Sequence, residues 1–150
     1  MKVPTRVECG IIALMDMVIY SKRSEAMTAG GIAARENISV KYLEQIFAVL
    51  RQAKIIRGLK GSRGGYVIAK PPDKITVREI IDALDINILS DVFFEDYSGK
   101  NAFAEAVNTC VWNKMTEGLQ AVASEITLAD LAEEYLNISA SQQGSYMYFI

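Results

Sequence analysis

TAGGIAARENISVKYLEQIFAVLRQAKIIRGLKGSRGGYVIA, residues 28–69, is the segment that decides the fold. Its order predicts a short helix from Thr28 to Ala34, a polar turn, and a longer amphipathic helix that begins after a cap at Ser39. Two short strands should follow, at residues 55–56 and 66–68, with a glycine-rich basic loop between them. This order of elements is typical of a winged helix-turn-helix, which holds one helix in the major groove of DNA.

The longer helix divides into an apolar stripe and a polar face. The residues that recur at helical spacing, and that we expect to be buried, are Val40, Leu43, Ile46, Phe47 and Leu50. The residues left to face outward are Lys41, Glu44, Gln45 and Arg51. In the loop between the strands, residues 61–65 include three glycines, which allow positive φ angles and a close approach of backbone to another molecule.

Charge is divided unevenly along the chain. Residues 1–80 hold 14 Lys and Arg against 7 Asp and Glu, a net charge of +7, whereas residues 81–150 hold 2 against 11, a net charge of −9. The total of −2 therefore hides a basic half joined to an acidic half. Such asymmetry indicates a nucleic-acid face on the first half, the alternative being a solvated basic surface without a partner.

The composition argues against several other protein classes. The chain begins without the apolar core of a signal peptide, and its longest apolar run, residues 11–20, is broken by Asp16 and too short to cross a bilayer. Two cysteines, Cys9 and Cys110, are too few for a disulfide scaffold. We expect a soluble cytoplasmic protein that is not an enzyme, because no histidine, metal-ligand cluster or nucleophile–base pair indicates catalysis.

We predict a mainly α-helical fold with a small β-hairpin wing, in three parts. These are a winged helix-turn-helix domain at residues 1–84, a linker at 85–100, and a dimerisation helix with a C-terminal tail at 101–150. Thr5 and Glu8 fit a capping box at the start of the first helix, and Thr76 and Glu79 fit a second box further along. The residues that the first helix should bury are Ile11, Ile12, Leu14, Met15, Val18 and Ile19.

A long helix is expected from about Asn101 to Ser124, followed by a short one that starts near Thr127. The long helix carries an apolar row at helical spacing: Val107, Val111, Met115, Leu119 and Val122. A row so far from the globular part favours pairing with the same helix of a second chain. The alternative is that the row packs on the first helix of its own chain.

Two motifs resemble the Rrf-two family of bacterial transcriptional regulators, to which IscR, NsrR and CymR belong. The first is IxxKYLEQIxxxLRxA at residues 38–53, and the second is GxxGGYxxAxPPxxITVxEII at residues 61–81. ITLADLA at residues 126–132 is also similar to the family. One departure is Lys54, where the family usually has glycine, and a left-handed backbone at this lysine would be strained.

The resemblance implies a homodimer that binds an imperfect palindrome in double-stranded DNA. The residues implied in contact with DNA are Ser39, Lys41, Tyr42, Glu44 and Gln45 on the third helix, Lys60, Ser62, Arg63 and Gly64 in the wing, and Arg6 on the first helix. Glutamine can pair with adenine and glutamate can accept from cytosine in the major groove, while wing cations meet phosphates or the minor groove. Each of these residues could instead be a solvated surface residue.

Many members of this family hold an iron–sulfur cluster through three cysteines in the segment before the long helix. Residues 85–100 contain no cysteine and the chain has no histidine, so we expect no metal and no cofactor. Cys110 is then either a core or interface residue or a redox switch, and Cys9 is expected in the core.

The cluster-free pattern and the apolar C-terminus are most similar to the CymR branch of the family, whose members repress cysteine metabolism. That resemblance implies a partner enzyme, the cysteine-synthesising O-acetylserine sulfhydrylase, which would bind Tyr148, Phe149 and Ile150. A free carboxylate beside an apolar side chain can imitate an amino-acid substrate in a preformed pocket. The alternative is that this end of the chain docks on the dimer.

The sequence therefore predicts a sequence-specific DNA-binding transcriptional regulator, a repressor of cysteine or sulfur metabolism that acts as a homodimer. Two alternatives stay open: a thiol-based redox-sensing regulator that acts through Cys110, and a winged-helix module that binds only protein.

Overall fold

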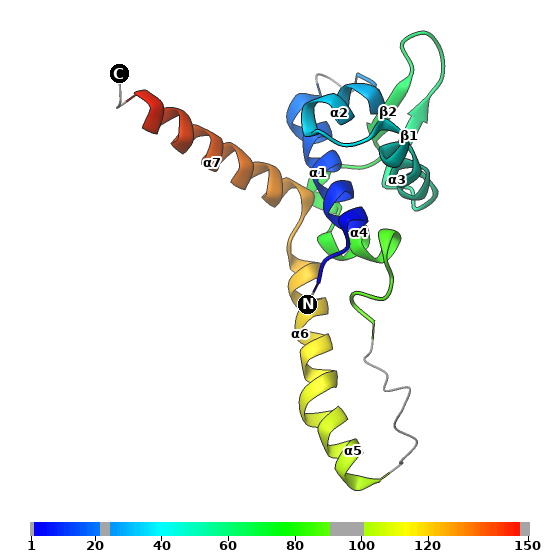
Figure 1. The fold of residues 1–150 in the computed structure, drawn as a ribbon, viewed down its shortest axis with the longest axis vertical. Helices are drawn as coiled ribbons and strands as arrows, with labels where there is room; N and C mark the ends of the chain where they lie inside the picture. The colour runs from blue at the N-terminus through cyan, green and yellow to red at the C-terminus, as the bar shows by residue number, and fades with distance from the viewer. Residues whose placement is uncertain (1, 22–24, 91–100, 148–150) are drawn as a thin grey trace.

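The computed structural model describes residues 2–21, 25–90 and 101–147 of the chain. The helices and strands are α1 (Thr5–Tyr20), α2 (Ala29–Glu36), α3 (Val40–Gln52), β1 (Ile56–Leu59), β2 (Gly65–Ile68), α4 (Val77–Leu84), α5 (Ala102–Val107), α6 (Asn113–Glu125) and α7 (Leu128–Met147). A π-helical turn, Asn108–Trp112, joins α5 to α6, and a short 3-10 helix, Pro72–Lys74, precedes α4. Helices α1 to α4 and the hairpin form a head, from which α5–α6 and α7 project in different directions (Figure 1). Within the described ranges, none of the helices combines the length and the apolar character that crossing a membrane requires.

The helix-turn-helix is α2, a tight turn and α3, and side chains cap both helices. The Thr28 hydroxyl accepts from the amide of Gly31 at 3.1 Å, and the Ser39 hydroxyl accepts from the amide of Tyr42 at 3.3 Å. Between the two helices Asn37 takes a left-handed conformation, with φ at 54°. Both caps confirm the sequence prediction, because each oxygen satisfies an amide that the first turn of a helix leaves free.

The wing is the antiparallel hairpin of β1 and β2, in which Ile56 pairs with Ile68. Its root is held by a bridge to the segment before α2, where the amide of Met27 donates to Tyr66 O at 2.9 Å and the amide of Tyr66 donates to Met27 O at 2.8 Å. Gly65 is required at this crossing, since its φ is 155° and an added Cβ would lie 2.6 Å from Met27 O.

Helix α1 is the central element of the head and contacts α2, α3, α4, α7 and β2. The wing packs on α3 through Phe47, whose ring meets the Tyr66 ring edge-on at 4.9 Å between centroids. The largest fully buried side chains come from all parts of the head and from the start of α7: Phe47, Leu14, Met17, Ile32, Leu43, Ile46, Leu50, Ile55, Ile56, Ile75, Ile80 and Leu128. One apolar core therefore fixes the position of α3 and the wing relative to each other.

The junction between α6 and α7 is attached to the head by backbone hydrogen bonds. The amide of Val77 donates to Ile126 O, and the amide of Leu128 donates to Ile75 O, each at 2.8 Å. Thr76, in the middle of this pairing, also caps α4 as predicted. The long helices and the head are thereby joined as one structure.

Four local predictions are wrong. Thr5 does not cap α1, because the helix already begins there, with Pro4 in the cap position and no side-chain cap hydrogen bond. Of the six residues expected in the core from α1 only Leu14 is fully buried, and the others are half-buried. Val40, expected in the stripe of α3, is 45% exposed at the first turn of that helix. The helix after residue 127 is long rather than short, since α7 has 20 residues.

Candidate nucleic-acid interface

The outward face of α3 carries the side chains that the sequence analysis assigned to the major groove. Lys41, Glu44 and Gln45 are exposed on successive turns, as predicted. Tyr42 is half-buried and packs against the core, so only part of its ring is accessible. The Ser39 hydroxyl is engaged as the cap of α3, which places this residue at the start of the helix with a structural task of its own.

The tip of the wing concentrates positive charge. Lys60, Ser62 and Arg63 are exposed there, and neither cation belongs to an ion pair within the described ranges. Gly64 shapes the turn, because its amide donates to Gly61 O at 2.9 Å and an added Cβ would lie 2.5 Å from Leu59 O. Unpaired cations on a tight turn can approach a phosphate backbone without first breaking a salt bridge. Arg6 is exposed in the first turn of α1, and its contact with DNA stays a prediction.

Behind the helix-turn-helix lies an ion pair that the sequence analysis missed. The buried Asp16 carboxylate of α1 accepts from Arg35 of α2, at 2.9 Å from Nε and 2.7 Å from the terminal nitrogen Nη2. The hydrogen bonds from Arg35 to Asp16 raise the pKa of that guanidinium, and a hydrogen bond with Asp16 raises the pKa of Glu36. The Tyr20 ring covers the guanidinium at 5.0 Å. The sequence does contain a signal for this ion pair. Asp16 is the one carboxylate within the apolar run of residues 11–20, and a buried charge needs a partner.

The group formed by Asp16, Arg35 and Tyr20 also contacts α7. A side-chain hydrogen bond with Tyr135 raises the pKa of Tyr20, so α7 touches the residue that covers the Arg35 guanidinium. The first helix of the helix-turn-helix is therefore connected both to the central helix and to the C-terminal helix.

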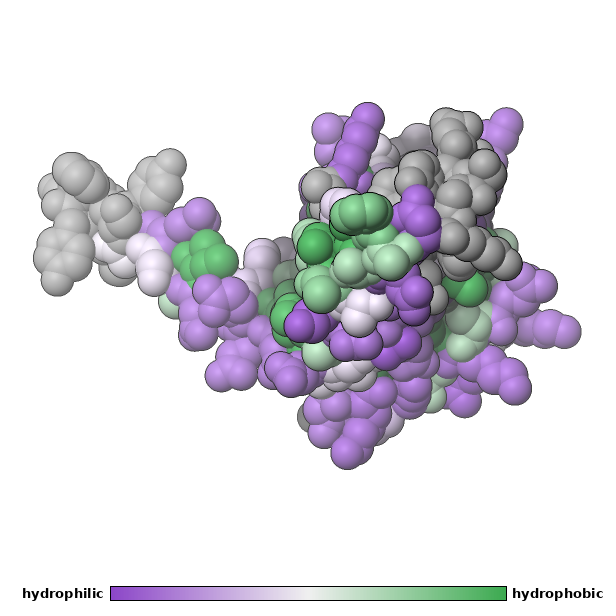
Figure 2. Space-filling model, turned by 90° about the horizontal axis from the view of Figure 1, so that it is seen from below, coloured by the Kyte–Doolittle hydropathy of each residue, from purple (hydrophilic) through white to green (hydrophobic). Residues whose placement is uncertain are grey.

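The predicted dimerisation row is exposed in the single chain. Its five members have exposed fractions between 38% and 56%: Val107, Val111, Met115, Leu119 and Val122. Packing of this row on the first helix of the same chain is therefore not the arrangement observed. Figure 2, viewed from the α5 end, shows apolar side chains gathered near the middle and a second apolar spot on the projecting α7.

The two cysteines lie in different settings. Cys110 is exposed in the π-helical turn, so it is not a core residue of the single chain, while an interface position and a redox role both stay predictions. Cys9 is half-buried against the core, and burial, with a smaller effect of Glu8, raises the pKa of its thiol. A raised pKa disfavours the reactive thiolate at Cys9.

These features define a winged helix-turn-helix DNA-binding protein. The family model of Rrf2, described as an iron-dependent transcriptional regulator, matches residues 3–134. The chain belongs to this family, the Rrf-two family of transcriptional regulators.

Known members are similar over most of their length. The chain is 30% identical to the regulator CymR of Bacillus subtilis over 151 aligned positions, which cover 100% of both proteins. It is 31% identical to IscR of Cereibacter sphaeroides over 122 residues, 81% of this chain and 77% of that one. The solved structure of CymR, the global cysteine regulator of B. subtilis, matches with a TM-score of 0.75 at 27% identity, covering 89% of this chain and 98% of that chain.

The family description refers to iron, but the donor set of this chain does not fit a cysteine-ligated cluster. Such clusters take four ligands, mostly thiolates, and the whole chain has two cysteines and no histidine. Across residues 2–21, 25–90 and 101–147, no three His, Cys, Asp or Glu side chains gather as a metal site would require.

Proposed function

We propose that the protein acts as a homodimer that binds an imperfect DNA palindrome, with α3 in the major groove and the wing on the flanking backbone. The observation that carries this proposal is the wing tip, where Lys60 and Arg63 are exposed without acidic partners in the described part of the chain. The contact between Phe47 and Tyr66 supports a joint action of α3 and the wing, since it holds the two at a set separation.

Salt dependence tests the backbone contact. Arg63→Ala should weaken binding to every duplex by a similar factor and reduce the slope of log K against log salt by about 1 for each chain's lost contact. The matched control is Lys114→Ala, which removes a cation from α6 and should leave both quantities unchanged. Equal affinities and slopes for Arg63→Ala and the unmodified protein would reject the proposed position of the wing.

Gln45 tests base recognition. Gln45→Ala should relax the preference for one base pair of the operator, at a cost of about 1–3 kcal/mol at that position, while affinity for unrelated DNA stays the same. Selection of bound sequences from a random pool measures this directly. An unchanged preference would place another side chain at that base pair.

The exposed apolar row supports dimerisation, because a continuous apolar strip on a projecting helix is unfavourable in water until a partner covers it. Met115→Asp would put a charge in the middle of the strip and should shift the protein towards monomer in sedimentation experiments. Asn113→Asp, on the far side of the same helix, is the control and should leave the dimer intact. A dimer of unchanged strength in Met115→Asp would show that the row is not the interface.

We also propose that the regulated genes belong to cysteine or sulfur metabolism and that the protein represses them. The support is the full-length similarity to CymR, whose structure is described as that of a global cysteine regulator. Sequencing the genomic DNA bound by the purified protein, with and without O-acetylserine sulfhydrylase, would reveal the operator and whether this enzyme matters. The proposed enzyme contacts Tyr148, Phe149 and Ile150 lie outside the described residues. Removing Phe149 and Ile150 should abolish enzyme binding, and unchanged affinity would reject the partner.

A redox response is the second candidate, favoured by the exposure of Cys110. Peroxide should change the DNA affinity of the unmodified protein, and it should have no effect on the DNA affinity of Cys110→Ser. A response that persists in the variant would exclude the thiol as sensor.

A further inference from the structure

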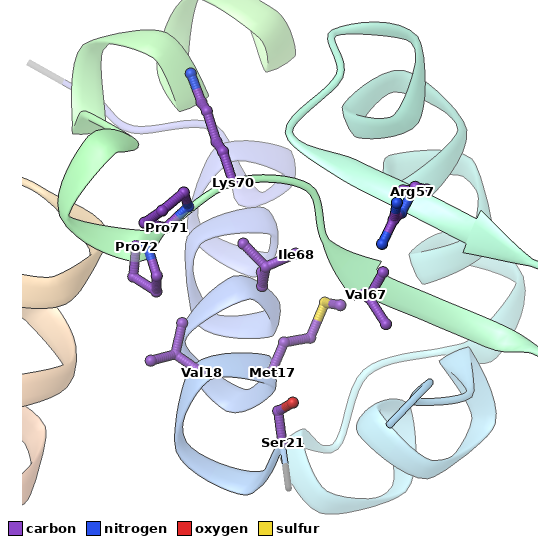
Figure 3. A pocket seen from close by; sticks show the side chains of 9 residues that line it. All are labelled: Met17, Val18, Ser21, Arg57, Val67, Ile68, Lys70, Pro71 and Pro72. Carbon is purple, nitrogen blue, oxygen red and sulfur yellow. The ribbon is translucent and has the colours of Figure 1, made fainter. Parts of the chain in front are cut away.

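A cavity of about 350 Å³ opens between the last turns of α1 and the root of the wing. Figure 3 shows α1 on one side, the strand pair on the other, and the two prolines after β2 closing one end. The lining combines apolar and polar groups in equal measure: Met17, Val18, Val67, Ile68, Pro71 and Pro72 lie around it with Ser21, and Arg57 of β1 lies at its edge. Its size falls within the range of small-molecule sites.

The two cations at this cavity, Lys70 and Arg57, differ in whether they have an acidic partner among the described residues. Lys70 also borders it, but Figure 3 shows the lysine side chain directed away, and its ammonium donates to the Glu79 carboxylate at 2.6 Å. Arg57 is exposed and enters no ion pair within the part of the chain that the structure describes. A guanidinium without an acidic partner among the described residues therefore lies close to the apolar side chains of Met17 and Ile68. A guanidinium binds a carboxylate through two parallel hydrogen bonds, which a neutral group cannot reproduce.

We propose that this cavity binds a small organic carboxylate with a compact apolar body, whose carboxylate pairs with Arg57 while its apolar part contacts Met17 and Ile68. An occupant would touch α1 and both strands of the wing, because Arg57 lies opposite Val67 in the strand register. A ligand in the cavity then changes the position of the wing. Its effect on the affinity for DNA rests on the proposed contact between the wing and the DNA backbone.

Binding is tested first on the protein without DNA, with phenylacetate as the probe and neutral phenylacetamide as its uncharged counterpart. Calorimetry should show that phenylacetate binds at least about tenfold more tightly than the amide, and that Arg57→Ala removes this difference. Arg51→Ala, which removes an exposed arginine of α3 outside the cavity, is the matched control and should bind as the unmodified protein does. Val18→Trp, which fills the cavity, should abolish binding without loss of the fold.

Three results would overturn the site: no binding of phenylacetate up to about 10 mM, equal binding of acid and amide, or unchanged binding in both Arg57→Ala and Val18→Trp. The effect on DNA is a separate measurement, in which saturating phenylacetate should change operator affinity about fivefold. Unchanged operator affinity with phenylacetate bound would reject the regulatory part alone. A protein that binds phenylacetate but no duplex would instead reject the proposed function and leave the cavity assignment standing.

Discussion

Replacing Arg35 with leucine is expected to cost the protein about 3–5 kcal/mol of unfolding free energy, because it strands a buried carboxylate. The Asp16 side chain is 0% exposed, and the guanidinium donates to both of its oxygens. Leucine would leave this charge in an apolar interior, with Glu36 as a second acidic group beside it.

Replacing the other partner, Asp16, with asparagine should cost less unfolding free energy. The Arg35 side chain is 38% exposed, so water can solvate the guanidinium once Asp16 is replaced by asparagine. The loss is then that of charge-assisted hydrogen bonds, about 1.5–3 kcal/mol. The structure thus predicts an asymmetry, in which removal of the exposed partner does more damage than removal of the buried one.

Urea unfolding followed by far-ultraviolet circular dichroism measures these differences. All variants are compared at one protein concentration, because the proposed association of two chains would add to the apparent stability. The control is Arg78→Leu, which breaks an exposed pair with Asp82 at 3.5 Å and should cost at most about 1 kcal/mol. The reasoning is refuted if Arg35→Leu costs no more than this control, or less than Asp16→Asn.

Three other changes test separate parts of the structure. Lys54→Gly should stabilise the fold by up to about 1 kcal/mol, since Lys54 has a φ of 61°, while Asn37→Gly should change little because asparagine tolerates this conformation; chemical unfolding measures both. Gly64→Ala should weaken DNA binding at unchanged helix content, whereas Gly58→Ala, with open space around it, should not, as gel-shift titration would show. Glu36→Gln should raise the thermal stability more at neutral than at acidic pH. The pKa of Glu36 is raised by its hydrogen bond with a buried carboxylate, so its own stabilising contribution exists below its unfolded pKa and is lost as pH rises through the folded one.

Much of the head could be predicted because its signals are local. The caps at Thr28, Ser39 and Thr76 occur as expected, since an oxygen and the amide three residues later interact within one turn. The strained conformation of Lys54 was also predictable, because the helix end alone requires it. Where several faces of a helix are apolar, as in α1, periodicity could not select the buried face, and the contacts with α2, α3, α4 and α7 decide it.

By itself the sequence determined the order of helices and hairpin, the apolar row of the long helix and the division of charge between the two halves, because these depend on neighbours along the chain. Only the tertiary structure decided that Asp16 meets Arg35, 19 residues away, that α7 is tied to the head through Tyr20 and Tyr135, and that Arg57 borders a cavity beside α1. Each of these depends on side chains from separate elements that meet only when the core packs.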